Sequence, residues 1–205
     1  MCGIVGGVSN KNITPLLLEG LNLLEYRGYD SSGLIVLTKN HTFDRARSVG
    51  KVKNLEDSLK KRKHQIIGNI GIAHTRWATH GEPSNHNAHP HISKNSVSIV
   101  HNGIIENYLE LKNNQLANGY NFTSETDTEV IAHAIDFAMK TSSNIISSVQ
   151  KALTTLKGSY GLGIVSSKYP NQLIAAKKGS PLVIGIGKSG NYIASDQMAL
   201  LSVTK

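Results

Sequence analysis

Cys2 is the residue whose type and position most directly suggest chemistry. It is the single cysteine of the 205-residue chain, and a lone cysteine is most often a small core hydrophobe. Its position favours another interpretation, because removal of Met1 would leave Cys2 with a free α-amine. An α-amine has a pKa of about 7.7–8.0, so part of it is neutral at physiological pH and can take the thiol proton. Nucleophile and base would then lie on one residue, as in catalysis by an N-terminal nucleophile.

Histidines form a second concentration of reactive side chains. Histidine is the commonest metal ligand, so a cluster of them could indicate a metal centre. No carboxylate spacing in this region completes a known ligand set, and we therefore expect neither a metal nor another cofactor. Six of the nine histidines lie between residues 74 and 101: His74, His80, His86, His89, His91 and His101.

Two glycine motifs near the C-terminus do not predict nucleotide binding. Gly185-x-Gly187-x-x-Gly190 fits the dinucleotide fingerprint, but the residues after it read as a strand and not as the helix that the fingerprint requires. Gly187-Lys188-Ser189 resembles the end of a P-loop, yet position 182 is leucine where that motif needs its first glycine. We reject both.

The charge of the chain raises the question of nucleic acid. Lys and Arg number 22 and Asp and Glu 14, which gives a net charge of +8. The densest basic run, 60–63, ends a segment in which Val52, Leu55 and Leu59 recur at helical spacing, with lysines on the other face. No aromatic residue interleaves with these lysines to stack on bases. The pattern indicates a solvated helix face and no nucleic-acid partner.

Composition limits the class of protein. Hydrophobic residues make up 39% and charged residues 18%, as in a globular chain. The apolar runs reach only five or six residues, so we expect no membrane span. Residues 1–20 lack the features of a signal peptide, which favours a cytoplasmic location, and a single cysteine excludes a disulfide framework.

The elements that must position Cys2 and the histidines alternate between strands and helices without a linker. Strands clustered at both ends, with helices between them, favour an α+β layered domain over a doubly wound sheet. The predicted strands are 3–8, 33–37, 43–48, 68–76, 97–101, 104–107, 160–166, 172–177, 182–186 and 191–195.

Capping and turn signals define the remaining boundaries. Thr14 predicts the cap of a helix that ends at Gly28. Thr126-x-x-Glu129 predicts a capping box at the start of another helix, and Asn102-Gly103 predicts a tight hairpin turn. Further helices are expected from Val52 and over 107–117 and 144–156.

Five motifs occur together in a pattern that is typical of one enzyme family. The chain resembles the glutaminase domains of the glucosamine-6-phosphate synthase family, which are class II glutamine amidotransferases of the N-terminal nucleophile hydrolase superfamily. The resemblance covers residues 1–205 as one domain. The motifs are Cys-Gly-Ile-Val-Gly at 2–6, Tyr-Arg-Gly-Tyr-Asp-Ser at 26–31, His-Thr-Arg-Trp-Ala-Thr-His-Gly at 74–81, His-Asn-Gly-Ile-Ile-Glu-Asn at 101–107 and Ser-Glu-Thr-Asp-Thr-Glu at 124–129.

The resemblance implies a four-layer αββα sandwich with two antiparallel sheets, and hydrolysis of L-glutamine to glutamate and ammonia through a Cys2 thioester. The Asn102 side chain and the Gly103 main-chain N–H would form the oxyanion hole. Arg76 would bind the α-carboxylate of glutamine and Asp127 its α-ammonium group. A surface arginine and a helix-stabilising aspartate are the plainer interpretations of those two residues.

Other positions match the family less sharply. Trp77, Thr79 and His80 lie on the loop that closes over glutamine in the family. Arg27 lies near the nucleophile there and would orient the N-terminus. His89 and His101 match positions near the catalytic centre, where a supporting hydrogen-bonding role is the expectation.

The family implies partners beyond this chain. A C-terminal pair of sugar-isomerase domains, absent here, binds fructose 6-phosphate and forms most of the dimer contacts, so the full-length enzyme is expected to be a homodimer. Three alternatives stay open: the glutaminase of purine biosynthesis, a silent glutamine-binding domain that retains Met1, and a basic nucleic-acid-binding module.

Overall fold

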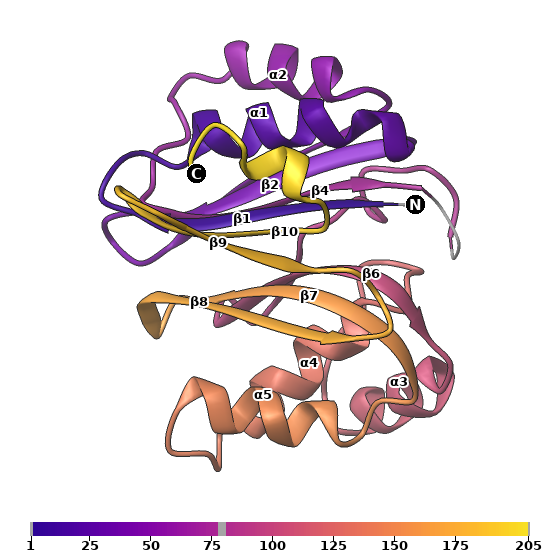
Figure 1. Cartoon of the computed structure of the whole chain (residues 1–205). Coiled ribbons are helices and arrows are strands. Elements are labelled where there is room, and N and C mark those ends of the chain that lie inside the picture. Colours follow the sequence, from indigo (N-terminus) through magenta and orange to yellow (C-terminus); the bar gives the residue numbers. More distant parts are fainter. Residues whose placement is uncertain (1, 78–80, 205) are drawn as a thin grey trace.

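The computed structural model describes residues 2–77 and 81–204. Two β-sheets lie face to face, and helices cover the outer face of each, as Figure 1 shows. All neighbouring strands among the described residues run antiparallel. The order of layers is therefore helix, sheet, sheet, helix, which confirms the αββα arrangement expected from the sequence.

The larger sheet has six strands in the order β3-β2-β4-β1-β10-β9. Its N-terminal strand β1 is central, with β4 on one side and β10 on the other, so the start of the chain is fixed between two neighbours. The strands are β1 (Gly3–Ser9), β2 (Ser31–Leu37), β3 (Phe43–Val49), β4 (Ile70–Arg76), β9 (Val183–Gly187) and β10 (Gly190–Ala194).

The smaller sheet has four strands in the order β5-β6-β7-β8. β6 and β7 pair over nine residues each, from Val97 opposite Ser166 to Ile105 opposite Gly158. The strands are β5 (His91–Ser93), β6 (Val97–Ile105), β7 (Gly158–Ser166) and β8 (Tyr169–Lys178). The sequence did not predict β5.

Among the described residues, five α-helices complete the outer layers: α1 (Thr14–Leu24), α2 (Val52–Lys60), α3 (Tyr108–Ala117), α4 (Glu129–Ala138) and α5 (Ile145–Leu153). Short 3-10 helices, η1 (Glu25–Arg27) and η2 (Gln197–Leu200), follow α1 and β10. No helix in the described part of the chain combines the length and apolarity needed to cross a bilayer.

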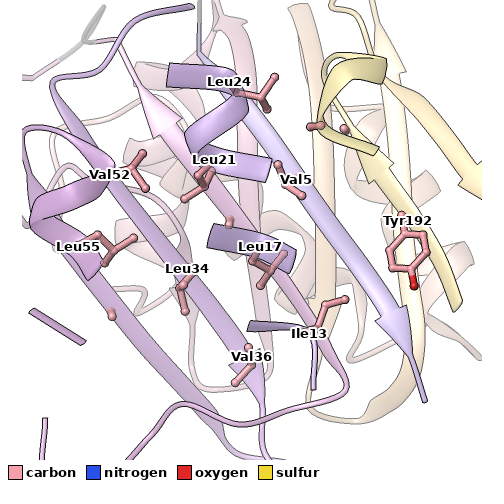
Figure 2. Close-up of a cluster of buried hydrophobic side chains, with 14 of the residues drawn as sticks. Val5, Ile13, Leu17, Leu21, Leu24, Leu34, Val36, Val52, Leu55 and Tyr192 are labelled. Atoms are coloured by element: carbon pink, nitrogen blue, oxygen red, sulfur yellow. The ribbon is translucent and has the colours of Figure 1, made fainter. Parts of the chain in front are cut away.

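Three apolar clusters hold the layers together. The first lies between α1, α2 and the larger sheet, where Leu17, Leu21 and Leu24 face Val5 and Leu34 (Figure 2). Each such side chain contributes about 1.5–3 kcal/mol when fully buried. The other two clusters lie between the sheets and between the smaller sheet and its helices. Helical spacing of leucines thus creates the face that packs on alternate strand residues.

The predicted hairpin turn at Asn102-Gly103 is wrong. β6 continues unbroken through both residues, with Asn102 opposite Gly161 and Gly103 opposite Tyr160 on β7. Gly103 has a φ of 138°, a conformation that glycine adopts readily. The nine-residue pairing with β7 overrides the local turn preference of the Asn-Gly pair.

Two predicted helix caps are also wrong. α1 begins at Thr14 as expected, but the Thr14 hydroxyl donates to the main-chain oxygen of Ile66. α4 begins at Glu129, not Thr126, and the Glu129 carboxylate accepts N–H bonds from Thr123 and Ser124. Thr14 thus bonds to a partner far away in the sequence, and Glu129 bonds to residues that precede Thr126.

The glycines at 185, 187 and 190 belong to the β9–β10 hairpin. An antiparallel pair of strands occupies the place where the dinucleotide fingerprint needs a strand followed by a helix. The rejection of that motif is confirmed.

Candidate active site

One cavity of about 410 Å³ lies where the two sheets meet the segment before α4. Its walls come from β4, β6 and β7, together with Cys2 and residues 126–128. Thr79 and His80, which the sequence also suggested, lie outside the described residues. The predicted site residues that line the cavity are Cys2, Arg27, Arg76, Trp77, His89, His101, Asn102, Gly103 and Asp127.

Cys2 lies directly before β1, at the end of a strand held on both sides. The main-chain N–H of Gly3 donates to the Thr75 hydroxyl at 3.1 Å, and that of Ile4 to the Ser195 hydroxyl at 3.0 Å. The Cys2 sulfur accepts the Trp77 N–H at 3.1 Å. The thiol therefore has a defined position at the cavity wall.

Burial raises the pKa of the Cys2 thiol. The Trp77 N–H and the charge of Arg76 act in the opposite direction, whereas Asp30 adds to the rise. The thiol thus stays protonated at neutral pH, and because the thiolate is the nucleophilic form, attack by this sulfur needs a base.

Asn102 and Gly103 lie on β6 opposite Cys2. The Asn102 side chain donates from Nδ2 to the main-chain oxygen of Cys2 at 3.1 Å, and its Oδ1 is 2.9 Å from His74 Nε2. A Cβ at Gly103 would overlap the main-chain oxygen of Ser159. The extended β6 strand, and not a turn, presents these two residues to the cavity.

Arg76 is a buried arginine at the end of β4, not a surface residue. Its guanidinium donates to the main-chain oxygens of Gly81 and Glu82, at 2.9 and 3.3 Å. Asp30 Oδ1 lies 3.8 Å from Arg76 Nη1. A buried arginine that lines a cavity is suited to binding an anionic group.

Asp127 is likewise buried, and it precedes α4 by two residues. Its Oδ2 accepts the main-chain N–H of Ile105 at 2.8 Å. The expected position of Asp127 in the first helical turn is therefore wrong, and its contact is with the end of β6. The cavity wall consequently holds the Asp127 carboxylate together with the guanidinium groups of Arg76 and Arg27.

Trp77 lines the cavity and has 58% of its surface exposed. Its ring lies so close to Gly28 that a Cβ there would overlap it. Arg27, also at the cavity, forms an ion pair with Asp196 at 3.2 Å, and Asp196 accepts the Tyr26 hydroxyl at 2.9 Å. The motif at 26–31 thus supports the segment around Trp77.

Four buried histidines form the back of the site. The rings of His74 and His89 stack with centroids 4.1 Å apart, and those of His89 and His91 meet edge to face at 4.7 Å. His101 is 2.9 Å from the Thr128 hydroxyl and donates its main-chain N–H to His89 Nδ1. Burial lowers the pKa of all four, so the rings are neutral at pH 7.

The sequence analysis assigned no role at the site to His74, Thr126, Thr128 or Ser159, which also line the cavity. His74 was visible in the motif at 74–81, but its contacts arise from the packing of one sheet on the other. Among residues 2–77 and 81–204, no group of three His, Cys, Asp or Glu side chains is arranged to hold a metal ion.

Comparison with known proteins shows the family. A model of the glutamine amidotransferase domain matches residues 74–202. The glutamine–fructose-6-phosphate aminotransferase (isomerizing) of Acinetobacter baylyi is 55% identical over 204 residues, and that of Buchnera aphidicola is 54% identical over 206. Each match covers 100% of this chain and 33% of the relative. The chain therefore spans about a third of the length of these relatives.

Solved structures show the same fold. The glutamine phosphoribosylpyrophosphate amidotransferase of B. subtilis, complexed with ADP and GMP, superposes with a TM-score of 0.82 at 25% identity and covers 99% of this chain and 44% of its own. This likeness confirms the N-terminal nucleophile hydrolase αββα fold. From the family match and the whole-length similarity together, the chain belongs to the glutamine amidotransferase domain family.

Proposed function

We propose that this chain hydrolyses L-glutamine to glutamate and ammonia, with Cys2 as the nucleophile after removal of Met1. The observation that carries the proposal is the composition of one cavity wall. It holds a thiol, a buried guanidinium, a buried carboxylate and the Asn102 carboxamide. These are the groups that attack on an amide and recognition of an amino acid require.

Charge complementarity supports glutamine as the substrate. Its α-carboxylate matches Arg76, whose planar group carries five N–H donors and can bind loop oxygens and a ligand together. Its α-ammonium group matches Asp127, whose carboxylate has further lone pairs beyond the one that accepts the Ile105 N–H. Trp77 lines the same cavity.

The first chemical step forms a thioester. The Cys2 α-amine takes the thiol proton, and the sulfur attacks the side-chain amide carbon of glutamine. Asn102 Nδ2 and the Gly103 N–H donate to the oxyanion that forms. The carbon–nitrogen bond then breaks, and the proton held on the α-amine passes to the leaving nitrogen, which departs as ammonia.

The second step hydrolyses the thioester. The neutral α-amine takes a proton from a water molecule, and the hydroxide attacks the thioester carbon. The carbon–sulfur bond breaks, glutamate is released, and the sulfur recovers its proton. Arg27, His89 and His101 support the site in this account, because each lines the cavity and is held by its own contacts.

The whole protein would use the ammonia for amino-sugar biosynthesis. The relatives at 54–55% identity are named glutamine–fructose-6-phosphate aminotransferases and are three times as long. We infer that a C-terminal isomerase part binds fructose 6-phosphate and converts it to glucosamine 6-phosphate, in a cytoplasmic homodimer. A solved allosteric regulatory enzyme of purine biosynthesis is only 26% identical, which makes purine synthesis the weaker alternative.

A glutaminase assay on protein of known N-terminus tests the proposal. Intact mass first establishes whether Met1 is absent. Protein without Met1 should release glutamate from glutamine, and diazo-oxo-norleucine should add one covalent mass at Cys2. Cys2→Ala should remove both results while its Tm stays close to that of the parent.

Two outcomes would contradict this account. Labelling at another residue, or turnover by Cys2→Ala, would exclude Cys2 as the nucleophile. Glutamine binding without turnover in protein that lacks Met1 would leave a binding domain instead of an enzyme.

A further inference from the structure

His74 links the two sheets at the candidate active site. It lies on β4 of the larger sheet, whereas Asn102 lies on β6 of the smaller one. His74 Nε2 is 2.9 Å from Asn102 Oδ1 and 3.0 Å from the main-chain oxygen of His101. A main-chain carbonyl can only accept a hydrogen bond. Nε2 therefore carries the proton and donates to both oxygens.

We propose that His74 is a positioning residue that fixes which end of the Asn102 carboxamide faces Cys2. The inference rests on the proposed function, because it assigns a partner to a donor that glutamine hydrolysis would use. With Oδ1 held by His74, Nδ2 points toward Cys2 and donates to its main-chain oxygen at 3.1 Å. The same amide nitrogen is the group assigned to the oxyanion.

The reversed orientation of the carboxamide is disfavoured at both ends. A rotation of 180° would place the Asn102 NH₂ group against the N–H of His74. It would also place Oδ1 against the main-chain oxygen of Cys2. Both hydrogen bonds would be lost in a buried place, where unpaired polar groups are costly. His74 thus stabilises one of two orientations of the Asn102 carboxamide that have the same shape.

The environment of His74 keeps this donor in place. Its side chain is 1% exposed, and its ring stacks on His89. Burial lowers the pKa of His74 to about 3, so the ring remains neutral with its proton on Nε2. Within the described residues, His74 Nδ1 is buried and has no hydrogen-bond partner. Nε2 is therefore the ring nitrogen through which His74 makes its hydrogen bonds.

A purely structural role for His74 makes a different prediction, so two substitutions separate the roles. His74→Leu fills the space between the sheets without a donor. His74→Gln offers an amide N–H at about the distance of Nε2. We expect His74→Leu to lower kcat about 10- to 100-fold, as a misplaced catalytic donor would. We expect KM to change little and His74→Gln to recover most of kcat.

His133 provides a matched control. It is also buried, it lies on α4 away from the cavity, and its Nδ1 is 2.9 Å from the Ser93 hydroxyl. His133→Leu should lower Tm with kcat retained. A loss of kcat in His133→Leu as large as that in His74→Leu would show that burial of any histidine matters, and it would overturn the inference.

A double-mutant cycle tests whether His74 acts through Asn102. In an Asn102→Ala background no carboxamide remains to be oriented, so adding His74→Leu should change kcat less than about twofold. If the two losses multiply, or if His74→Leu raises KM with kcat unchanged, His74 does not position Asn102.

Nitrogen-15 NMR tests the inference without an activity assay. The parent protein should show His74 as the Nε2–H tautomer, and the Asn102 NH₂ signals should broaden or double in His74→Leu but stay close to those of the parent in His74→Gln. An Nδ1–H tautomer in the parent, or unchanged Asn102 signals in His74→Leu, would overturn the inference. Absence of glutamine hydrolysis by the parent protein without Met1 would instead overturn the proposed function alone.

Discussion

At the residue scale, the same side chain often serves the fold and the cavity at once. Asn102 bonds to Cys2 on one side and to His74 on the other, so its removal could affect packing as well as chemistry. Asp127 holds the Ile105 N–H and also faces the cavity. Kinetic and stability measurements on the same variant are therefore needed to separate the two contributions.

Asn102→Ala should lower kcat for glutamine hydrolysis about 10²–10³-fold, the loss typical of one oxyanion donor. KM should change little, because Arg76 and Asp127 remain. Asn107 is the control, since its side chain bonds to Thr155 and Lys157 beyond the end of β6, and Asn107→Ala should retain kcat. A raised KM with kcat unchanged in Asn102→Ala would assign Asn102 to binding.

Asp127→Asn keeps an oxygen for the Ile105 N–H but removes the charge. We expect kcat/KM for glutamine to fall about 10- to 100-fold, in line with loss of a charged hydrogen bond, with Tm nearly unchanged. Measuring kcat/KM and Tm on the same samples of Asp127→Asn and of the parent protein checks this prediction.

Glu129→Gln is the matched control for Asp127→Asn. Glu129 holds the N–H groups of Thr123 and Ser124, so its substitution should cost about 1–3 kcal/mol of stability and leave kcat/KM largely intact. Unchanged kinetics with a lowered Tm in Asp127→Asn would make that residue a structural one as well.

At the element scale, strand and helix positions were predicted well from the sequence. Periodicity located α1, α2 and most strands, because each has a face that must be buried, and the expected helices at 107–117 and 144–156 correspond to α3 and α5. The predicted element boundaries are wrong where a hydrogen-bond partner far away in the sequence determines the local structure. Thr126 bonds to His91, which the local pattern at 126–129 cannot reveal.

The site was predictable in its residue types but not in its geometry. The motifs identified Cys2, Arg76, Asn102 and Asp127 because their spacing matches a known family. The Asn-Gly pair, however, indicated a turn where β6 is straight. The partnership of His74 and Asn102 depends on how two sheets face each other, and no periodicity within one strand contains that information.

Gly103→Ala tests whether the straight β6 depends on this glycine. Gly103 has a φ of 138°, and a Cβ there would overlap the Ser159 oxygen on β7. We expect a loss of about 2–4 kcal/mol in the free energy of unfolding, measured by urea denaturation, together with loss of glutaminase activity.

Gly119→Ala separates the cost of a positive φ from the cost of steric overlap by a new Cβ. It has a φ of 75° with open space around its Cβ position, so Gly119→Ala should cost only about 1–2 kcal/mol and keep activity. Equal losses in the two variants would mean that the contact with β7 is unimportant.

At the scale of the whole molecule, the two-sheet architecture encloses a buried apolar layer with polar groups at the cavity. Between the sheets, Ile4, Ile35, Ile72 and Val100 form an apolar cluster. The histidines His74, His89, His91 and His101 continue the buried region to the cavity wall. The fold thus places buried, neutral imidazoles behind the reacting groups, and hydrogen bonds to a developing charge are stronger in such buried surroundings than in water.

The buried histidines make folding stability depend on pH. Their pKa values are lowered in the folded protein, that of His74 to about 3, whereas an unfolded histidine has a pKa of about 6.5. Below pH 6.5 the unfolded chain therefore binds protons that the folded chain does not. Stability should fall as pH drops from about 7 toward 4, by up to about 1.4 kcal/mol per pH unit for each histidine.

Urea denaturation at pH 7.5, 6.5 and 5.5 measures this slope. His91→Gln removes one buried imidazole, so its stability should decline less steeply with acidification than that of the parent. Ser98→Ala is the control, because it removes only the hydrogen bond to the His91 main-chain oxygen. It should lower stability equally at every pH and leave the slope unchanged. A parent protein with the same free energy of unfolding at pH 7.5 and 5.5 would contradict this prediction, because it would show that the buried histidines take up protons as readily in the folded chain as in the unfolded one.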